Sequence, residues 1–111
     1  MAKTNRPVSP YATEAASLLG QLIRRARIER AMPVAAVTER AGISRGLLRR
    51  IEAGDTGCTI GAVFEVAALV GVRLFGAEEA TLSRDIEANR DVMTLLPKSI
   101  RKPRTEPDDD F

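Results

Sequence analysis

The sequence has 111 residues, 44% of them hydrophobic, which is enough for one domain with a core of its own but not for two. It holds no histidine and one cysteine, Cys58, so Ser-His-Asp and Cys-His nucleophile systems, an internal disulfide and most zinc sites are excluded, and we predict neither an enzyme nor a metal- or cofactor-dependent protein. Its 17 basic and 15 acidic residues give a net charge of +2, a sum that by itself argues against a nucleic-acid partner.

The start of the chain, residues 1–16, is rich in Pro, Ser, Thr and Ala without apolar periodicity, and we predict a mobile N-terminal arm that becomes helical near Thr13. No segment offers the apolar core of a signal peptide or the roughly 20 apolar residues of a membrane span, so we expect a cytoplasmic protein. From Ser17 to about Ala31, apolar residues recur at helical spacing with arginines on the other face. The predicted buried stripe of this first helix is Leu19, Leu22, Ile23 and Ala26.

Two short helices should follow, separated by a tight turn. Pro33 stands where the second helix begins, and Gly42 supplies the left-handed residue that ends it. Ser44 is a good N-cap for the third helix, which ends at Gly54. The predicted inward residues are Val34, Val37 and Ala41 on the second helix and Leu48 and Ile51 on the third.

A fourth helix is predicted after the loop Asp55–Cys58, capped by Thr59 and ended by Gly71. Its expected stripe is Ile60, Val63, Phe64 and Ala67. The next residues, Val72–Phe75, fit either a linker or one short strand, and a lone strand would have to pair with its copy in a dimer.

The last predicted helix runs from Ala77 to about Leu96 and closes at Pro97. Its stripe is spaced like a coiled-coil seam with one polar position and consists of Leu82, Ile86, Asn89, Met93 and Leu96. Packing on its own domain and pairing in a dimer are both open for this stripe. Residues 98–111 form a charged, proline-containing tail that should be disordered when alone.

The small net charge conceals a gradient along the chain. Residues 17–54 carry eight arginines against three glutamates, a net charge of +5, whereas residues 55–97 carry seven acidic residues against three arginines, a net charge of −4. Arginine has the planar fork that suits phosphates and guanine edges. The basic block coincides with the two short helices and their turn, which is the outline of a helix-turn-helix.

The segment from Met32 to Gly54 resembles the Xre-type, lambda-repressor-like helix-turn-helix family. The resemblance lies in the turn Ala41-Gly42-Ile43-Ser44, in the ending Ile51-Glu52-x-Gly54 and in the fourth helix from Thr59 to Gly71. It implies an all-α fold: a lambda-repressor-like five-helix DNA-binding domain over residues 17–76, an additional C-terminal helix over residues 77–97 and a disordered tail.

The resemblance also implies a DNA-binding surface on the third helix, which in this family lies in the major groove. Arg45 and Arg50 would read bases, Arg49 would read a base or contact a phosphate, and Ser44 would donate to a phosphate. The implied DNA-binding set is Ser44, Arg45, Gly46, Arg49 and Arg50, beside a structural ion pair between Arg27 and Glu52. The likeness departs from the family at Val34 and Leu47, where polar side chains are usual, and this leaves the operator sequence open.

The tail from Leu95 to Arg104, with the acidic end that follows, resembles the tails of HipB-like antitoxins. Those proteins repress their own operon as dimers and bind a HipA-type kinase toxin. The aromatic ring could anchor in a pocket of the toxin while the carboxylates beside it meet a basic rim. The candidate toxin-binding group is therefore Asp108, Asp109, Asp110 and Phe111. The basic part of the tail could instead follow the DNA backbone.

Three functions therefore remain at this stage. The first is a nucleoid-associated homodimer that binds a palindromic operator in double-stranded DNA, autoregulates its operon and captures a kinase toxin. The second is a free-standing repressor of phage, plasmid or restriction-modification type without a toxin partner. The third is a protein-interaction module that keeps the fold but has lost specific DNA reading, as Val34 and Leu47 hint.

Overall fold

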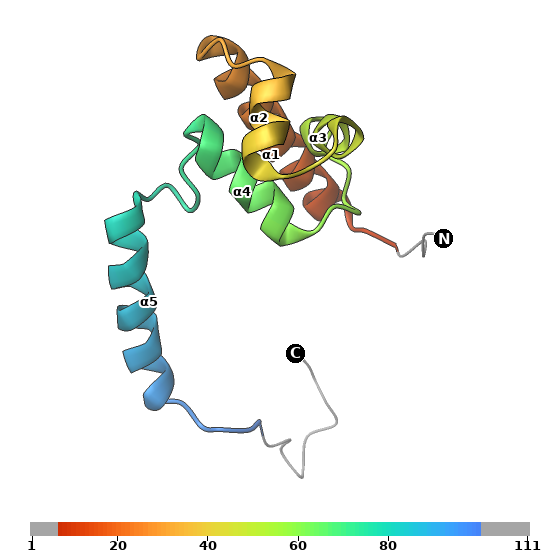
Figure 1. The fold of residues 1–111 in the computed structure, drawn as a ribbon. Helices are drawn as coiled ribbons and strands as arrows, with labels where there is room; N and C mark the ends of the chain where they lie inside the picture. Colours follow the sequence, from red (N-terminus) through yellow and green to blue (C-terminus); the bar gives the residue numbers. More distant parts are fainter. Residues whose placement is uncertain (1–6, 101–111) are drawn as a thin grey trace. The chain divides into compact units, whose positions relative to one another are not determined.

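The computed structural model describes residues 7–100 of the chain, and the structural statements below concern those residues. They form five helices (Figure 1): α1 Pro10–Glu29, α2 Val34–Ala41, α3 Arg45–Glu52, α4 Ile60–Val70 and α5 Glu79–Thr94. The first four helices belong to one compact unit that extends to Gly76, and α5 belongs to a second unit. The predicted all-α fold with a helix-turn-helix is confirmed. Where five helices were expected before the C-terminal helix, however, the described part of this unit has four, because a turn follows α4.

The first helix begins earlier than its apolar stripe indicates. Ser9 is the N-cap, its hydroxyl oxygen accepts a hydrogen bond of 3.2 Å from the amide of Ala12, and Pro10 occupies the first helical position. The helix therefore begins three residues before Thr13, where the arm was predicted to become helical, and residues 1–6 lie outside the described part. The first turns of α1 are exposed apart from Ala16, so no buried stripe marks them in the sequence.

The other helix boundaries follow the local signals. Ser44 and Thr59 cap α3 and α4, and their hydroxyl oxygens accept from the amides of Leu47 and Ala62. Gly42 adopts a left-handed conformation with φ of 68° and ends α2, which turns the chain toward α3. The turn between α2 and α3 therefore has the expected chemistry.

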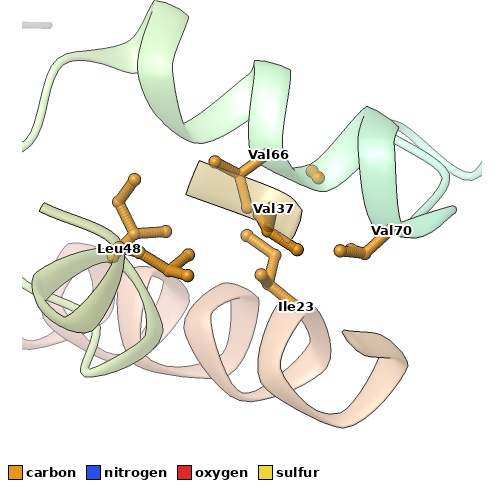
Figure 2. Packing of buried hydrophobic residues seen from close by; sticks show 7 residues of the cluster. Ile23, Val37, Leu48, Val66 and Val70 are labelled. Carbon is orange, nitrogen blue, oxygen red and sulfur yellow. The ribbon is translucent and has the colours of Figure 1, made fainter. Parts of the chain in front are cut away.

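The core lies where α1 to α4 meet, and Figure 2 shows side chains from all four helices converging there. Its buried members are Ile23, Val37, Leu48, Ile51, Val66, Ala67 and Val70. Two predicted core residues are wrong, because Leu22 and Ile60 are exposed. Val66 and Val70 were not expected; nearly every residue of α4 is apolar, so periodicity alone does not fix which face is buried.

A backbone contact fixes α3 against α1 at Gly20. A Cβ atom at this position would lie 2.5 Å from the carbonyl oxygen of Ile51 and 2.8 Å from that of Glu52, closer than such contacts occur. Only glycine lets the last turn of α3 approach α1 so closely. The position of α3 is therefore set by backbone contact as well as by its buried side chains.

The segment after α4 forms a turn rather than a strand. Phe75 has a φ of 57° and Gly76 a φ of 63°, a left-handed pair that does not continue an extended chain. Val72 and Leu74 are partly buried against the core, while the Phe75 ring meets Phe64 edge to face with centroids 6.3 Å apart. Of the two predicted alternatives, the linker fits this backbone.

The helix α5 is shorter than predicted, since it runs from Glu79 to Thr94. None of its residues is buried, and Ile86 and Met93 are 56% and 60% exposed. No helix in the described part is long and apolar enough to cross a membrane, and no group of three potential metal ligands occurs there.

Candidate nucleic-acid interface

The helix α3 has one face in the core and one in solvent. Leu48 and Ile51 are buried, whereas Arg45, Arg49 and Arg50 are exposed. An eight-residue helix is marginal on its own, so its stability comes from this packing and from the Ser44 cap. The exposed arginines therefore stand on a helix with a fixed position.

Two of these arginines face a hollow in the surface. Arg45 and Arg49 are four residues apart on one side of α3 and line a depression of about 400 Å³ between α1, α2 and α3. Arg24 of α1 lines the same depression. Three exposed arginine side chains from two helices, Arg24, Arg45 and Arg49, thus line one opening together with the less exposed Arg27.

The same hollow contains the ion pair between Arg27 and Glu52 that the resemblance implies. Arg27 Nε and Nη2 donate to the two carboxylate oxygens of Glu52 at 2.6 and 3.2 Å, and Arg27 Nη1 donates to the carbonyl oxygen of Met32 at 3.1 Å. The hydrogen bond to Glu52 raises the pKa of Arg27 against the opposing effect of partial burial. This pair links α1 to the end of α3, and its side chains are only 12% and 9% exposed.

The third arginine of α3 has a different partner. Arg50 Nε donates to Oδ2 of Asp55 at 3.0 Å, and the other carboxylate oxygen of Asp55 accepts from the amide of Gly57 at 2.7 Å. The hydrogen bond to Asp55 raises the pKa of Arg50, and the charge interactions of Arg50 with ionised Cys58 and with Asp55 act in the same direction. Arg50 does not line the hollow, so the structure separates it from Arg45 and Arg49.

Gly46 and Ser44 mark the N-terminal end of α3. A Cβ atom at Gly46 would meet only the hydroxyl of Ser44, at 3.9 Å, so nothing in the fold requires glycine there. Glycine inside a helix costs stability, and a glycine on an exposed helix face leaves room for another molecule to approach the backbone closely. The Ser44 hydroxyl oxygen caps α3, which leaves its proton available to an acceptor such as phosphate.

The structure shows where the two residues that depart from the family pattern lie. Val34 and Leu47 are partly buried and pack against the core, as predicted for Val34. Val34 also lines the hollow. The candidate tail residues Asp108, Asp109, Asp110 and Phe111 lie outside the described part of the chain.

Arg24 is the candidate that sequence reasoning missed. A signal was present, because Arg24 precedes Arg27 by three residues and therefore lies on the same side of α1. Since Arg27 is tied to the end of α3, its neighbour one turn earlier comes close to α3 as well. Arg24 Nε lies 3.9 Å from the Glu52 carboxylate, at the edge of the ion pair.

A helix, a tight left-handed turn and a second helix with an arginine-bearing outer face define a helix-turn-helix protein. A family model for the helix-turn-helix domain matches residues 18–83, which is more than half of the chain. The chain therefore belongs to the helix-turn-helix family, a fold that serves DNA binding. Searches of curated proteins and of solved structures find no significant match.

Proposed function

We propose that this protein is a sequence-specific regulator that places α3 in the major groove of double-stranded DNA. The observation that supports this most is that Arg45 and Arg49 lie on the same exposed side of a helix whose other side is buried. An arginine held in this way can donate two hydrogen bonds to O6 and N7 of a guanine, the commonest specific contact in the major groove.

Each residue of this face has a proposed role. Arg45, near the N-terminal end of α3, reads a base, and Arg49 reads a base or contacts a phosphate. Gly46 lets the duplex approach the helix backbone, and Ser44 donates to a phosphate. Arg24 contacts the phosphate backbone from α1, because it lines the hollow beside Arg45 and Arg49.

Arg50 has a conditional role in this proposal. It must exchange its ion pair with Asp55 for a contact to DNA, or share its five donors between them. We therefore place Arg50 behind Arg45 as a base reader, although the sequence gives the two residues equal standing.

We propose further that the chain acts as a cytoplasmic, nucleoid-associated homodimer that represses transcription from a palindromic operator. One eight-residue helix contacts few base pairs, so two copies are needed for a long specific site. A two-fold dimer places two half-sites about 34 Å apart, one turn of the duplex. The exposed apolar residues of α5 support a second copy as partner.

The finer proposal is an antitoxin that binds a HipA-type kinase toxin and represses its own operon. Its support is the composition of residues 98–111, with a basic run followed by acids and a terminal aromatic. A chain truncated after Pro97 should keep operator binding and lose capture of a kinase encoded beside it. Unchanged capture would favour the alternative of a free-standing repressor without a toxin.

The DNA-binding proposal is tested by selecting bound sequences from a random duplex library with the full chain. Arg45→Ala should weaken binding to the selected site by about 1–3 kcal/mol and relax the preference at one base pair. Arg25→Ala is the control, because Arg25 is exposed on α1, is paired with Glu29 and does not line the hollow. Failure to enrich any sequence would favour the alternative of an interaction module that has lost DNA reading.

A further inference from the structure

The helix α5 carries an apolar stripe that is not buried in the described part of the chain. Leu82, Ile86 and Met93 lie on one side with Asn89 between them, at spacings of four, three and four residues. This is the spacing of the a and d positions of a two-stranded coiled coil. Ile86 and Met93 are more than half exposed, and with Asn89 and Arg90 they line a shallow depression.

Opposite charges flank this stripe on its two sides. With Ile86 and Met93 as a positions, Asp85 is a g position and Arg90 is an e position. Within the described part of the chain, neither residue forms an ion pair. Each therefore stands beside an exposed apolar seam with no ion pair among residues 7–100.

The separation of these charges selects one arrangement of two helices. In a parallel coiled coil a g residue reaches the e residue that lies five positions further along the partner helix, and Asp85 and Arg90 are five positions apart. Two symmetric pairs, each between Asp85 of one copy and Arg90 of the other, then close both sides of the seam. In an antiparallel pair e faces e and g faces g, so Asp85 and Arg90 do not meet.

Asn89 favours the same arrangement. Its Nδ2 atom lies 3.7 Å from the sulfur of Met93 in the same helix, a weak contact that leaves most of the amide's hydrogen-bonding capacity unused. In a parallel, in-register dimer Asn89 faces its own copy, and the two amides can bond to each other. Asn89 is a d position in this assignment, and pairing it with its own copy satisfies both amides inside the seam, which an offset or antiparallel alignment does not do.

We propose that α5 binds α5 of a second copy, in parallel and in register, with reciprocal ion pairs between Asp85 and Arg90. The two-fold axis of the pair then runs along the seam, and a palindrome has the same kind of symmetry. This inference rests on the homodimer of the proposed function, but it does not depend on DNA binding. It assigns the dimer interface to a surface outside the α1–α4 unit.

The pairing is tested by sedimentation equilibrium of the full chain without DNA. Asp85→Arg should raise the dimer dissociation constant about tenfold at low salt, because both attractive pairs become repulsive, and the effect should shrink in high salt. Adding Arg90→Asp to this variant should restore association. Asp91→Arg is the matched control: it makes the same charge change at an f position, which points away from the seam.

The orientation is tested by oxidation of Leu82→Cys in a Cys58→Ser background. In the parallel arrangement the two introduced thiols face each other and crosslink, whereas in an antiparallel pair they lie about 16 Å apart along the seam. A monomeric wild-type chain would overturn both this inference and the proposed homodimer. A dimer that tolerates Asp85→Arg, or that weakens equally with Asp91→Arg, would overturn this inference alone.

Discussion

The helices α3 and α5 both carry apolar residues at helical spacing along one side, yet they differ in what covers those residues. The eight residues of α3 bury Leu48 and Ile51 in the core, whereas the sixteen residues of α5 bury none. An apolar stripe thus predicts that a helix has a partner, but not whether the partner belongs to the same chain. For α3 the partner is the rest of the core that it forms with α1, α2 and α4, and for α5 we propose a second copy.

The difference has a physical origin in backbone contact. At Gly20 the α1 helix meets the carbonyl groups at the end of α3 directly, and the Arg27–Glu52 pair joins the same two helices. Within the described residues no such glycine contact or ion pair involves α5. Substitutions in the two regions should therefore differ in their effects.

The largest loss of stability should come from truncating an isoleucine in the core, and the same truncation on α5 provides the comparison. Ile23→Ala should lower the free energy of unfolding by about 3–4 kcal/mol, because Ile23 is fully buried at the centre of the core. Ile86→Ala should instead lower stability only at chain concentrations where the dimer forms. Urea unfolding followed by circular dichroism at two concentrations compares them. Equal losses at both concentrations would remove the distinction between the regions.

The next largest effect concerns the ion pair that holds α3. Glu52→Gln should cost about 2–4 kcal/mol, since it leaves the partly buried Arg27 without its charge partner. Glu29→Gln is the matched control in the exposed pair with Arg25 and should cost less than about 0.5 kcal/mol. Thermal unfolding of both variants measures the contrast, and similar costs would show that the Arg27–Glu52 pair adds nothing special to the position of α3.

Smaller effects are expected at two glycines, where alanine should change stability alike but DNA binding differently. Gly46 and Gly61 are the second residues of α3 and α4, and both have room for a methyl group. Either glycine replaced by alanine should stabilise the fold by about 0.5–1 kcal/mol. Gly46→Ala should nevertheless weaken DNA binding severalfold, and Gly61→Ala should not. Unaltered binding by Gly46→Ala would show that the duplex does not approach the backbone there.

The smallest effect should come from Arg24. Arg24→Gln should weaken binding to all duplexes alike and reduce the dependence of log K on log salt by about one unit, because one phosphate contact is lost. Arg25→Gln removes the same charge from the next position, outside the hollow, and should leave the slope unchanged. Titrations at several salt concentrations decide between them, and equal slopes for the two variants would exclude Arg24 from the interface.

Much of the α1–α4 unit could be predicted because its signals are local. Ser44, Thr59, Gly42 and Gly71 act on backbone groups within a few residues, and the helix boundaries that depend on them agree with the structure. The start of α1 was missed because the prediction followed the apolar stripe rather than the Ser9-Pro10 signal. Within α4 the buried face could not be read, since almost every residue is apolar.

The candidate site was less accessible to sequence reasoning. The exposed face of α3 follows from helical periodicity, and the Arg27–Glu52 pair followed from a family resemblance. The contribution of Arg24 and the engagement of Arg50 by Asp55 depend on how helices and loops meet in space. Such tertiary neighbours leave little trace in a single sequence.

On the proposed function, the contact between Arg50 and Asp55 affects how the protein searches DNA for its site. An arginine that already has a carboxylate partner adds little to the long-range attraction of random DNA. In that search Arg45 and Arg49 supply most of the non-specific attraction, and Arg50 leaves Asp55 only where the guanine edge accepts its hydrogen bonds instead. Asp55 then sets the dwell time on wrong sequences, which makes an acidic loop residue part of the search kinetics.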